Sequence, residues 1–336
     1  MESPKCLGAV IIGRNEGDRL KACLRSTHTV IKNIVYVDSG STDGSIEFAE
    51  SMGVSVVNLD TSIPFSAARA RNEGFRQLLK EHPETEYVQF VDGDCQVADG
   101  WLEAAYSFLE NDPSCAIVCG RRQEKFPEAS LYNLFCDIEW DTPVGEAGAC
   151  GGDFLGRVEA LEAVEGFNPS VIAGEEPEMC FRLREKNWKI FRIDHLMTHH
   201  DAQMTEFQQW WQRAKRCGHA YAQGFDMHGM SPEKYYRREV KSAITWGGVI
   251  PVLLLLVTGL AIVGLTPPFS LVLWLLPAVL FLKVLKYSLG PKKLPFQPAV
   301  LYSLSLVVAK IPELVGVQKY YQRKRKNSGF SIIEYK

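Results

Sequence analysis

The stretch Tyr87-Val88-Gln89-Phe90-Val91-Asp92-Gly93-Asp94 decides how the first part of the chain folds. Its mostly apolar residues are typical of a strand buried inside a sheet, and this strand ends in two carboxylates. Side chains at positions i and i+2 of an extended chain point to the same side. Two such carboxylates about 4 Å apart repel by about 4 kcal/mol at an effective dielectric of about 20. We therefore expect a divalent cation that prefers oxygen ligands, Mg²⁺ or Mn²⁺, beside Asp92 and Asp94.

The chain around this stretch alternates short apolar runs with helical patterns. Strands are predicted over residues 7–12, 34–37 and 54–57, and helices over residues 18–25, 45–52 and 66–81. Such alternation predicts a Rossmann-like α/β fold, in which a mostly parallel sheet is flanked by helices. Ligands of these sheets bind beyond the carboxyl ends of the strands. The polar groups at those ends are therefore expected to share one cleft: Gly13-Arg14-Asn15-Glu16, Asp38, Asp92 and Asp94.

Length and composition allow one large domain with a smaller module, because the chain has 336 residues. Its nine cysteines are an odd number and form no Cys-x-x-Cys pair, so neither a disulfide framework nor a zinc knuckle is expected. Reduced thiols fit a cytoplasmic compartment. The N-terminus lacks the basic-then-apolar pattern of a signal peptide, so the first domain is expected to stay on one side of a membrane.

Charge divides the chain into two physically different parts. Residues 241–336 carry 12 Lys or Arg against 2 Asp or Glu, whereas the first 240 residues carry 25 Lys or Arg against 38 Asp or Glu.

The basic part, residues 241–336, is also apolar. Residues 244–265 contain no charged side chain, and at about 1.5 Å per residue they match a hydrocarbon core of about 30 Å. After a turn at Thr266-Pro267-Pro268, residues 269–289 return, which predicts a transmembrane hairpin. A pair of helices buried in a protein core is the alternative.

Basic flanks predict the orientation of this hairpin. Lys and Arg residues lie on the cytoplasmic side of spanning segments, and they both precede and follow the hairpin: Arg237, Arg238, Lys241, Lys292 and Lys293. A third apolar run, residues 299–317, is interrupted by charges and a proline, and we expect an interfacial or re-entrant helix there. The predicted division is an amphipathic connector over 226–243, a membrane region over 244–318 and a basic cytoplasmic tail over 319–336.

Five segments of the first 225 residues resemble the motifs of family 2 glycosyltransferases, in the order and spacing of that family. They are Val10-Ile11-Ile12-Gly13-Arg14-Asn15-Glu16, Val37-Asp38-Ser39-Gly40-Ser41-Thr42-Asp43-Gly44, Ala68-Arg69-Ala70-Arg71-Asn72-Glu73-Gly74, Val91-Asp92-Gly93-Asp94 and Gly174-Glu175-Glu176-Pro177-Glu178. The resemblance implies a GT-A domain over residues 1–225, a UDP- or GDP-sugar donor, a divalent metal and transfer with inversion at the anomeric carbon.

The resemblance also implies roles for the residues that would bind the donor. Asp38 matches the aspartate that recognises the nucleotide base, although Asp-Ser-Gly-Ser-Thr-Asp-Gly is also good turn chemistry. Arg14 and Glu16 match the loop that touches the nucleoside, and Arg71 matches an arginine that reaches the donor. An exposed charge without a partner would be the plainer interpretation of these three.

Metal and sugar ligands follow in the same way. Asp92 would contact the ribose or the metal, and Asp94 would bind the metal directly. A strand is predicted over residues 189–193, and His199 and His200 follow it. His200 matches a histidine that completes the metal shell, or would be a surface histidine, whereas its neighbour His199 would face the other side of an extended chain. Asp153, in a loop that resembles the one shaping the sugar pocket, would hydrogen-bond a sugar hydroxyl or would be an ordinary turn residue.

Glu176 is the candidate catalytic base. Pro177 is expected as the first residue of a helix, which makes Glu176 the cap, where free N–H groups and the helix dipole favour an ionised carboxylate. The family shows Glu-Asp here, so Glu175-Glu176 leaves open which of the two is the base. An ionised carboxylate in this position takes the proton from an attacking hydroxyl.

These inferences predict a membrane-anchored inverting glycosyltransferase that adds one sugar to a lipid-linked acceptor in envelope polysaccharide or exopolysaccharide synthesis. The catalytic domain is expected on the cytoplasmic face of the inner or plasma membrane, with no nucleic-acid partner. A polyprenyl-phosphate sugar synthase is the alternative enzyme, and a nucleotide-sugar-sensing membrane subunit is the alternative without chemistry. The basic aromatic stretch Trp210–Arg216 would meet an anionic lipid phosphate or headgroups, or would rest as an amphipathic helix at the interface.

Overall fold

The computed structural model describes residues 6–326, which form two compact units. Residues 6–205 make up the first unit and residues 206–326 the second. The helix α8 (Phe207–His228), which the expected domain over residues 1–225 included in part, belongs to the second unit.

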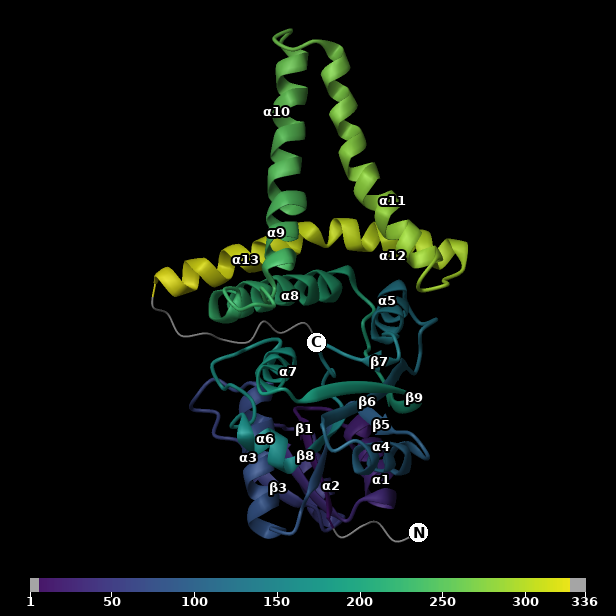
Figure 1. Ribbon diagram of the computed structural model, residues 1–336, viewed down its shortest axis with the longest axis vertical. Helices are drawn as coiled ribbons and strands as arrows, with labels where there is room; N and C mark the ends of the chain where they lie inside the picture. Colours follow the sequence, from purple (N-terminus) through teal and green to yellow (C-terminus); the bar gives the residue numbers. More distant parts are fainter. Residues whose placement is uncertain (1–5, 327–336) are drawn as a thin grey trace. The chain divides into compact units, whose positions relative to one another are not determined.

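One mixed sheet of nine strands organises the first unit (Figure 1). Its order is β3-β2-β1-β4-β8-β6-β9-β5, and β7 pairs with β9. The part from β3 to β4 is parallel, whereas β8 runs antiparallel to both β4 and β6. The strands are β1 (Leu7–Gly13), β2 (Asn33–Asp38), β3 (Ser55–Asn58), β4 (Tyr87–Asp92), β5 (Cys95–Val97), β6 (Cys115–Glu124), β7 (Gly145–Glu146), β8 (Phe154–Arg157) and β9 (Lys189–His200).

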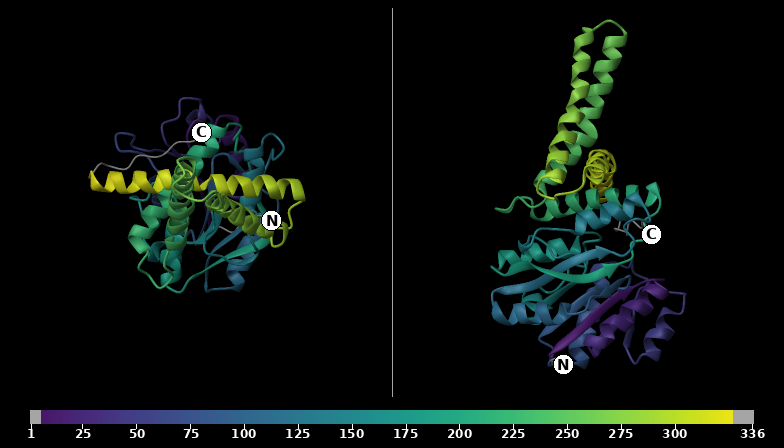
Figure 2. Two further views of the ribbon diagram at one scale, coloured as in Figure 1. Left: turned by 90° about the horizontal axis from the view of Figure 1, so that it is seen from above. Right: turned by 90° about the vertical axis from the view of Figure 1, so that its right-hand side faces the viewer.

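Helices flank this sheet, which confirms the expected α/β fold. They are α1 (Asp18–Val30), α2 (Ser45–Ser51), α3 (Ala67–Glu81), α4 (Trp101–Asn111), α5 (Leu131–Trp140), α6 (Val158–Ala163) and α7 (Glu175–Glu185). The core between sheet and helices is built from the apolar runs of the strands, such as Val88, Phe90 and Val91 of β4, which are at most 1% exposed. Figure 2 shows the layers from two further sides.

Two elements are longer than the sequence patterns predict. α1 continues past Arg25 to Val30, and the hydroxyl of its buried Thr27 donates to the carbonyl of Cys23 at 2.9 Å. β9 continues past Ile193 to His200, so that His199 and His200 lie within the strand and do not follow it. Both extensions bring polar residues into regular structure through pairing with neighbouring elements rather than through an apolar pattern.

The second unit is helical throughout its regular structure. Besides α8 it contains α9 (Arg237–Ile244), the π-helical turn η1 (Thr245–Val249), α10 (Ile250–Ile262), the 3₁₀ segment η2 (Pro268–Leu275), α11 (Leu276–Leu289), α12 (Phe296–Val308) and α13 (Lys310–Arg325). α9, η1 and α10 join into one helix of 26 residues, and α12 and α13 into another of 30 residues. Within this unit α12 and α13 run across the direction of α10 and α11 (Figures 1 and 2).

Glycines bring helices of the second unit into backbone contact. A side chain at Gly218 of α8 would collide with the carbonyl of Glu313 on α13, and one at Gly316 of α13 would collide with the carbonyl of Lys215 on α8. Because neither position carries a Cβ atom, the two helices cross at the closest distance that their backbones allow.

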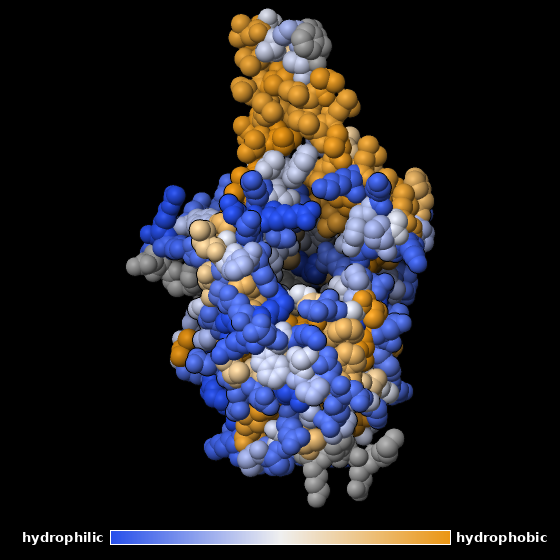
Figure 3. Space-filling view, viewed as in Figure 1, coloured by the Kyte–Doolittle hydropathy of each residue, from blue (hydrophilic) through white to orange (hydrophobic). Residues whose placement is uncertain are grey.

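Three helices of the second unit are long and apolar enough to cross a membrane, among residues 6–326. They are Arg237–Ile262, Ser270–Leu289 and Phe296–Arg325. Figure 3 shows a continuous hydrophobic surface over α10 and α11. Large apolar side chains such as Leu255, Ile262 and Val279 are 59–79% exposed there. The helix Phe296–Arg325 differs, because 39% of its most apolar stretch is buried inside the protein.

Candidate active site

The carboxyl ends of the three central parallel strands meet at one edge of the sheet. Gly13 of β1 pairs with Asp38 of β2, and Ile12 of β1 pairs with Asp92 of β4. The amide of Gly93 donates to the carbonyl of Ile12 at 2.8 Å. The residues after β4 then turn away, and Cys95 begins β5, which pairs with β9 elsewhere in the sheet. The strand ends therefore share one edge, as the topology predicted.

Asp92 lies between two arginines. Its Oδ1 is 2.7 Å from Nη2 of Arg71, and its Oδ2 is 3.1 Å from Nη2 of Arg122. Burial raises the pKa of Asp92, but the charges of Arg71 and Arg122 outweigh burial and hold this pKa well below its usual value. The protein itself thus supplies counter-charges to Asp92, and the expected cation beside Asp92 and Asp94 stays a prediction.

Arg71 on α3 joins Asp92 to the start of α7. Its Nη1 is 2.7 Å from Oε1 of Glu175, and its guanidinium lies 5.5 Å from the centre of the Phe167 ring. Arg71 is only 3% exposed and Glu175 only 4%. Two carboxylates hold the side chain of Arg71 inside the protein, and its expected contact with the donor stays a prediction.

Asp153 accepts a hydrogen bond from the backbone of Asp92. One of its oxygens accepts a hydrogen bond from the amide of Asp92 at 2.9 Å, and the other accepts from the hydroxyl of Thr198 at 2.7 Å and lies 2.8 Å from Arg122. Asp153 has no exposed surface, and its expected contact with a sugar hydroxyl stays a prediction. Its role here is to position Asp92 and Arg122.

Gly152 is the point of closest approach to these charges. A Cβ atom at this position would collide with Oδ2 of Asp92 and would lie 2.9 Å from Nη2 of Arg122 and 3.0 Å from Nη2 of Arg71. The loop before β8 therefore requires glycine here, because any side chain would displace the charges around Asp92.

Asp94 faces a different set of groups. Its Oδ1 is 3.3 Å from Nε2 of His200 and 3.7 Å from Sγ of Cys95. Nδ1 of His200 is 3.5 Å from Oε2 of Glu124, and the Trp140 ring packs edge-on against the imidazole at 4.6 Å. Burial lowers the pKa of His200, which favours the neutral imidazole that binds metals. An oxygen, a nitrogen and a sulfur close together form a donor set that fits a divalent metal.

Glu176 stands apart from the ion pairs, since it has none with any residue in the described range 6–326. The helix α7 begins at Glu175 with Gly174 as its cap, so Glu176 is the second residue of the helix and not the cap that Pro177 suggested. Partial burial, together with the charge of Glu175, raises the pKa of Glu176 to about 7. Glu175 is committed to Arg71, which leaves Glu176 as the carboxylate that is available to a substrate.

The loops after β1 and β2 brace each other. The side-chain oxygen of Asn15 accepts from the amide of Thr42 at 2.8 Å, and Asp43 accepts from the amide of Gly17 at 2.7 Å. Asp38 is 1% exposed; one oxygen accepts from the Tyr36 hydroxyl and the other from the amides that follow it, so it performs the turn chemistry recognised in the sequence. Its proposed contact with a base stays a prediction.

Arg14 and Glu16 occupy the more accessible part of this region. Arg14 is exposed and lies 4.7 Å above the ring of Phe65, whereas Glu16 is partly buried and paired with Arg19 at 2.6 Å. Arg14 packs on Phe65 and Glu16 pairs with Arg19 of α1, and the expected contacts of both residues with the nucleoside stay predictions.

Comparison with known proteins identifies the family of the first unit. Residues 9–161 match the model described as glycosyl transferase family 2. This part of the chain belongs to that family. Glycosyltransferase AglE of Haloferax volcanii is 23% identical over 189 residues, which cover 52% of this chain and 60% of AglE. The fold is similar to that of mannosyltransferase PcManGT from Pyrobaculum calidifontis in complex with GDP-Man and Mn²⁺, with a TM-score of 0.63 and 16% identity over 95% of this chain and 88% of that one. The GT-A fold is thereby confirmed.

Sequence reasoning missed three residues of the candidate site. Arg122 and Glu124 stand at the end of β6, and Cys95 follows Asp94 directly. The available signal was a buried apolar strand, Cys115–Cys119, that runs into charged residues at its carboxyl end. Nothing in the sequence says that this end meets Asp92 and His200, because the pairing joins segments far apart in the chain.

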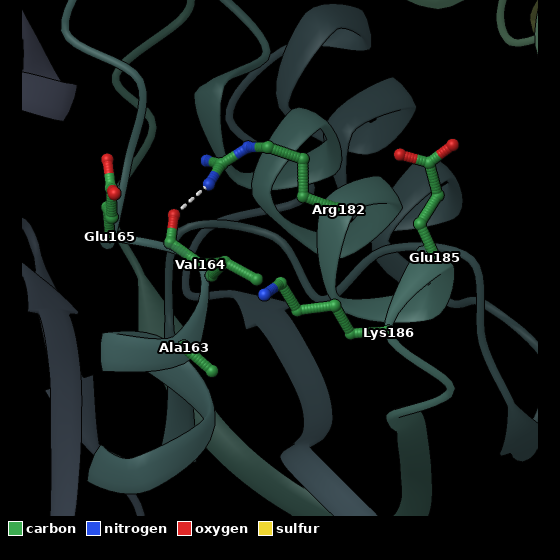
Figure 4. A pocket seen from close by; sticks show the side chains of 6 residues that line it. All are labelled: Ala163, Val164, Glu165, Arg182, Glu185 and Lys186. Atoms are coloured by element: carbon green, nitrogen blue, oxygen red, sulfur yellow. Dashed lines mark hydrogen bonds between the residues drawn. The ribbon is translucent and has the colours of Figure 1, made fainter.

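A pocket of about 350 Å³ lies elsewhere on the family 2 domain (Figure 4). Its lining comes from the end of α6 and the end of α7: Ala163, Val164, Glu165, Arg182, Glu185 and Lys186. Arg182 is already hydrogen-bonded to Glu178 and to the carbonyl of Val164. None of the candidate site residues lines this pocket, so it does not bear on the chemistry.

Proposed function

We propose that the protein is a membrane-anchored, metal-dependent inverting glycosyltransferase that moves one sugar from a UDP- or GDP-sugar to a hydroxyl of a lipid-linked saccharide. The observation that carries this proposal is the bridge through Arg71. Arg71 forms ion pairs with both Asp92 and Glu175. Asp92 belongs to the same motif as Asp94, which lies close to His200 as a potential metal ligand. Glu175 directly precedes Glu176. The residues suited to the leaving diphosphate and the residue suited to the acceptor are therefore connected through Arg71.

On the donor side, Asp94 and His200 would hold Mg²⁺ or Mn²⁺. When bound, such an ion stabilises the negative charge that grows on the leaving nucleoside diphosphate. Asp92 stays ionised beside Arg71 and Arg122, which hold its carboxylate in one orientation, and it would contact the ribose or the metal. The mutually braced loops after β1 and β2 would receive the nucleoside, with Arg14 and Phe65 at its edge. GDP-mannose is the first donor to test, because the structure of similar fold holds it.

On the acceptor side, Glu176 takes the proton of the attacking hydroxyl. A base whose pKa is about 7 is half deprotonated near neutral pH and still basic enough to accept a proton. Glu175 remains ionised toward Arg71 and holds α7 in place. Attack from the side opposite the leaving diphosphate inverts the anomeric carbon.

The second unit would anchor the enzyme in the inner or plasma membrane. The exposed apolar surfaces of α10 and α11 support a spanning hairpin, and its basic flanks support a cytoplasmic catalytic domain. α12 and α13 would lie at the interface, because Lys310 and Glu313 form a 2.7 Å ion pair in the middle of this helix, and its direction crosses the hairpin. An enzyme placed in this way suits lipid-linked intermediates of envelope polysaccharide or exopolysaccharide synthesis.

A polyprenyl-phosphate sugar synthase is the second candidate. The basic aromatic residues of α8 favour it, since Trp211, Arg213 and Arg216 suit an anionic lipid phosphate. A phosphate acceptor is already ionised and scarcely needs a base. A nucleotide-sugar-sensing subunit without chemistry is the remaining alternative, and metal-dependent hydrolysis of a nucleotide sugar by the purified protein would exclude it.

Replacement of Glu176 by Gln separates the two enzymes. The full-length protein in detergent is given Mn²⁺ and the nucleotide sugar that yields most released diphosphate, with either a lipid-linked saccharide or a polyprenyl phosphate as acceptor. For transfer to a hydroxyl, Glu176→Gln should lower kcat by about 10² to 10⁴-fold, because general base catalysis contributes that much. Glu185→Gln, at the exposed end of the same helix, is the matched control. Full activity of Glu176→Gln on a hydroxyl acceptor would contradict the proposed base.

A further inference from the structure

The cluster beside Asp94 contains a thiol placed by strand pairing. Cys95 begins β5 and pairs directly with His200 of β9 in antiparallel register. Residues directly opposite each other in such a pair carry their side chains on the same face, with Cβ atoms about 5 Å apart. Cys95 and His200 therefore face the same side of the sheet, and Asp94 adjoins them from the turn.

Distances within this cluster are those of potential ligands of one ion. Nε2 of His200 lies 3.3 Å from Oδ1 of Asp94, and Sγ of Cys95 lies 3.7 Å from the same oxygen. The ligand atoms of all three residues lie within 4.8 Å of one another. Cys95 has no exposed surface, and Asp94 and His200 are each 6% exposed. The three donor atoms are thus shielded from bulk water.

Glu124 lies next to the second ring nitrogen of His200, without a hydrogen bond between them. Its Oε2 lies 3.5 Å from Nδ1 of His200 and accepts a hydrogen bond from the amide of Ala202 at 3.1 Å. Its Oε1 accepts from the amide of Phe126 at 3.1 Å, so the carboxylate itself is fixed. A carboxylate behind one ring nitrogen, with the other nitrogen toward the ligand set, is the usual support of a metal-binding histidine.

An ordinary buried cysteine has different surroundings. Cys115, also without exposed surface, has its Sγ 3.2 Å from the carbonyl of Ile117 inside the core. Cys95 instead has a carboxylate oxygen and an imidazole nitrogen as neighbours. Packing alone accounts for the first thiol and not for the position of the second.

We propose that Cys95 supplies a third, sulfur ligand to the metal of the proposed donor site and so sets which ion the site prefers. This inference rests on the proposed function. Hard ions such as Mg²⁺ favour oxygen, whereas imidazole and thiolate favour softer transition metals. The site therefore prefers Mn²⁺ over Mg²⁺ and binds Zn²⁺ and Cd²⁺ most tightly. Binding displaces the thiol proton to solvent, and the sulfur bonds to the ion.

The first test uses Cd²⁺ as the probe. The full-length protein in detergent, reduced and without nucleotide, is titrated with Cd²⁺ while sulfur-to-cadmium charge-transfer absorption is recorded in the ultraviolet. The band expected in the wild type should be lost in Cys95→Ser, and the Cd²⁺ affinity should fall about 10- to 100-fold, since even a ligand's supporting partner contributes that much. Cys115→Ser should leave both unchanged. Cys95→Ala serves if thermal unfolding shows that the serine variant does not fold.

The second test measures selectivity without turnover. Free Mn²⁺ is followed by electron paramagnetic resonance while Mg²⁺ competes for the protein. The ratio of Mn²⁺ to Mg²⁺ affinity should fall by about tenfold in Cys95→Ser, because only the softer ion gains from sulfur. An unchanged ratio would overturn the proposal.

A rival sulfur source lies at Cys150 and Cys180, whose Sγ atoms are 3.5 Å apart. If the Cd²⁺ band persists in Cys95→Ser and disappears in Cys150→Ser, the role of Cys95 is wrong. Asp94→Asn and His200→Ala separate this inference from the function on which it rests. Unchanged Mn²⁺ binding in both variants would overturn the proposed metal site itself, whereas loss in both with no effect of Cys95→Ser would overturn only the sulfur ligand.

Discussion

Asp92 and Asp94 are two residues apart, and the protein treats their charges in opposite ways. Asp92 lies 2.7 and 3.1 Å from two arginines, which balance its charge from within the fold. Asp94 lies among an imidazole nitrogen and a sulfur, which are potential ligands and not fixed cations. The turn at Gly93 separates these surroundings, because β4 and β5 join different parts of the sheet. One carboxylate of this motif is thus ion-paired with arginines of the protein, and the other is a candidate metal ligand.

The largest effect should come from Asp94, through chemistry and not through stability. Asp94→Asn keeps the size of the side chain but removes a charged ligand, so transfer should fall by about 10³-fold, equivalent to about 4 kcal/mol. Released nucleoside diphosphate measured with Mn²⁺ checks the rate, and circular dichroism checks that thermal unfolding is little changed. Donor turnover that resists both this change and a chelator would refute the proposed site.

Arg71 tests the other half of the comparison, through stability. Arg71→Met removes a counter-charge from the buried Glu175 and the partly buried Asp92, which should cost about 3–5 kcal/mol. The midpoint of thermal unfolding of the full-length protein in detergent measures the loss. Arg76→Met on the same helix is the control, because its side chain is 65% exposed and such surface pairs contribute at most about 1 kcal/mol. Equal effects of the two changes would show that the bridge through Arg71 is not structural.

Gly152→Ala should disturb the surroundings of Asp92 more gently. The added methyl group would meet Asp92, Arg122 and Arg71, and overpacking of this kind costs about 1–3 kcal/mol. Donor affinity should fall together with stability, as measured by nucleotide titration and thermal unfolding. Gly148→Ala, where a Cβ atom would meet no atom within 4 Å, should change neither. A silent Gly152→Ala would mean that the loop before β8 yields freely.

Acidity should produce the smallest effect, and only at Glu176. Because the pKa of Glu176 is raised to about 7, the base is protonated below neutral pH and the rate falls as pH decreases. Between pH 8 and pH 6, kcat/KM should drop about tenfold, whereas Asp92 stays ionised throughout. A pH profile of donor transfer measures this limb. A profile that stays flat down to pH 5 would assign the proton transfer to another group.

Local patterns predicted the strands well and the polar extensions poorly. The buried runs of β1, β2 and β4 are apolar on both faces, and the predicted limits lie within one residue of the observed ones. Polar residues end the apolar pattern before α1 and β9 end, although neighbouring strands and helices continue to support them. Gly174 caps α7 in a left-handed conformation, so the helix starts at Glu175, two residues before the start suggested by Pro177.

The candidate site divides along the same line. Asp94 and His200 were predicted from the resemblance, and the structure brings them together. The partners of Asp92 were not predictable, because Arg122 and Asp153 reach it through the order of the strands and not through spacing in the sequence. The distinction between Glu175 and Glu176 likewise depends on Arg71, which lies on a helix about a hundred residues earlier in the chain.

The crossing of α8 and α13 has a consequence for the apolar hairpin between them. The backbones of α8 and α13 are in contact at Gly218 and Gly316. The chain that leaves α8 is therefore held against α8 again when it returns as α13. The hairpin of α10 and α11 therefore leaves and returns to the contact between α8 and α13, and this contact sets its direction. Exposed apolar residues of α10 and α11 can be replaced without altering that direction, whereas one methyl group at either glycine would push the backbones of α8 and α13 apart.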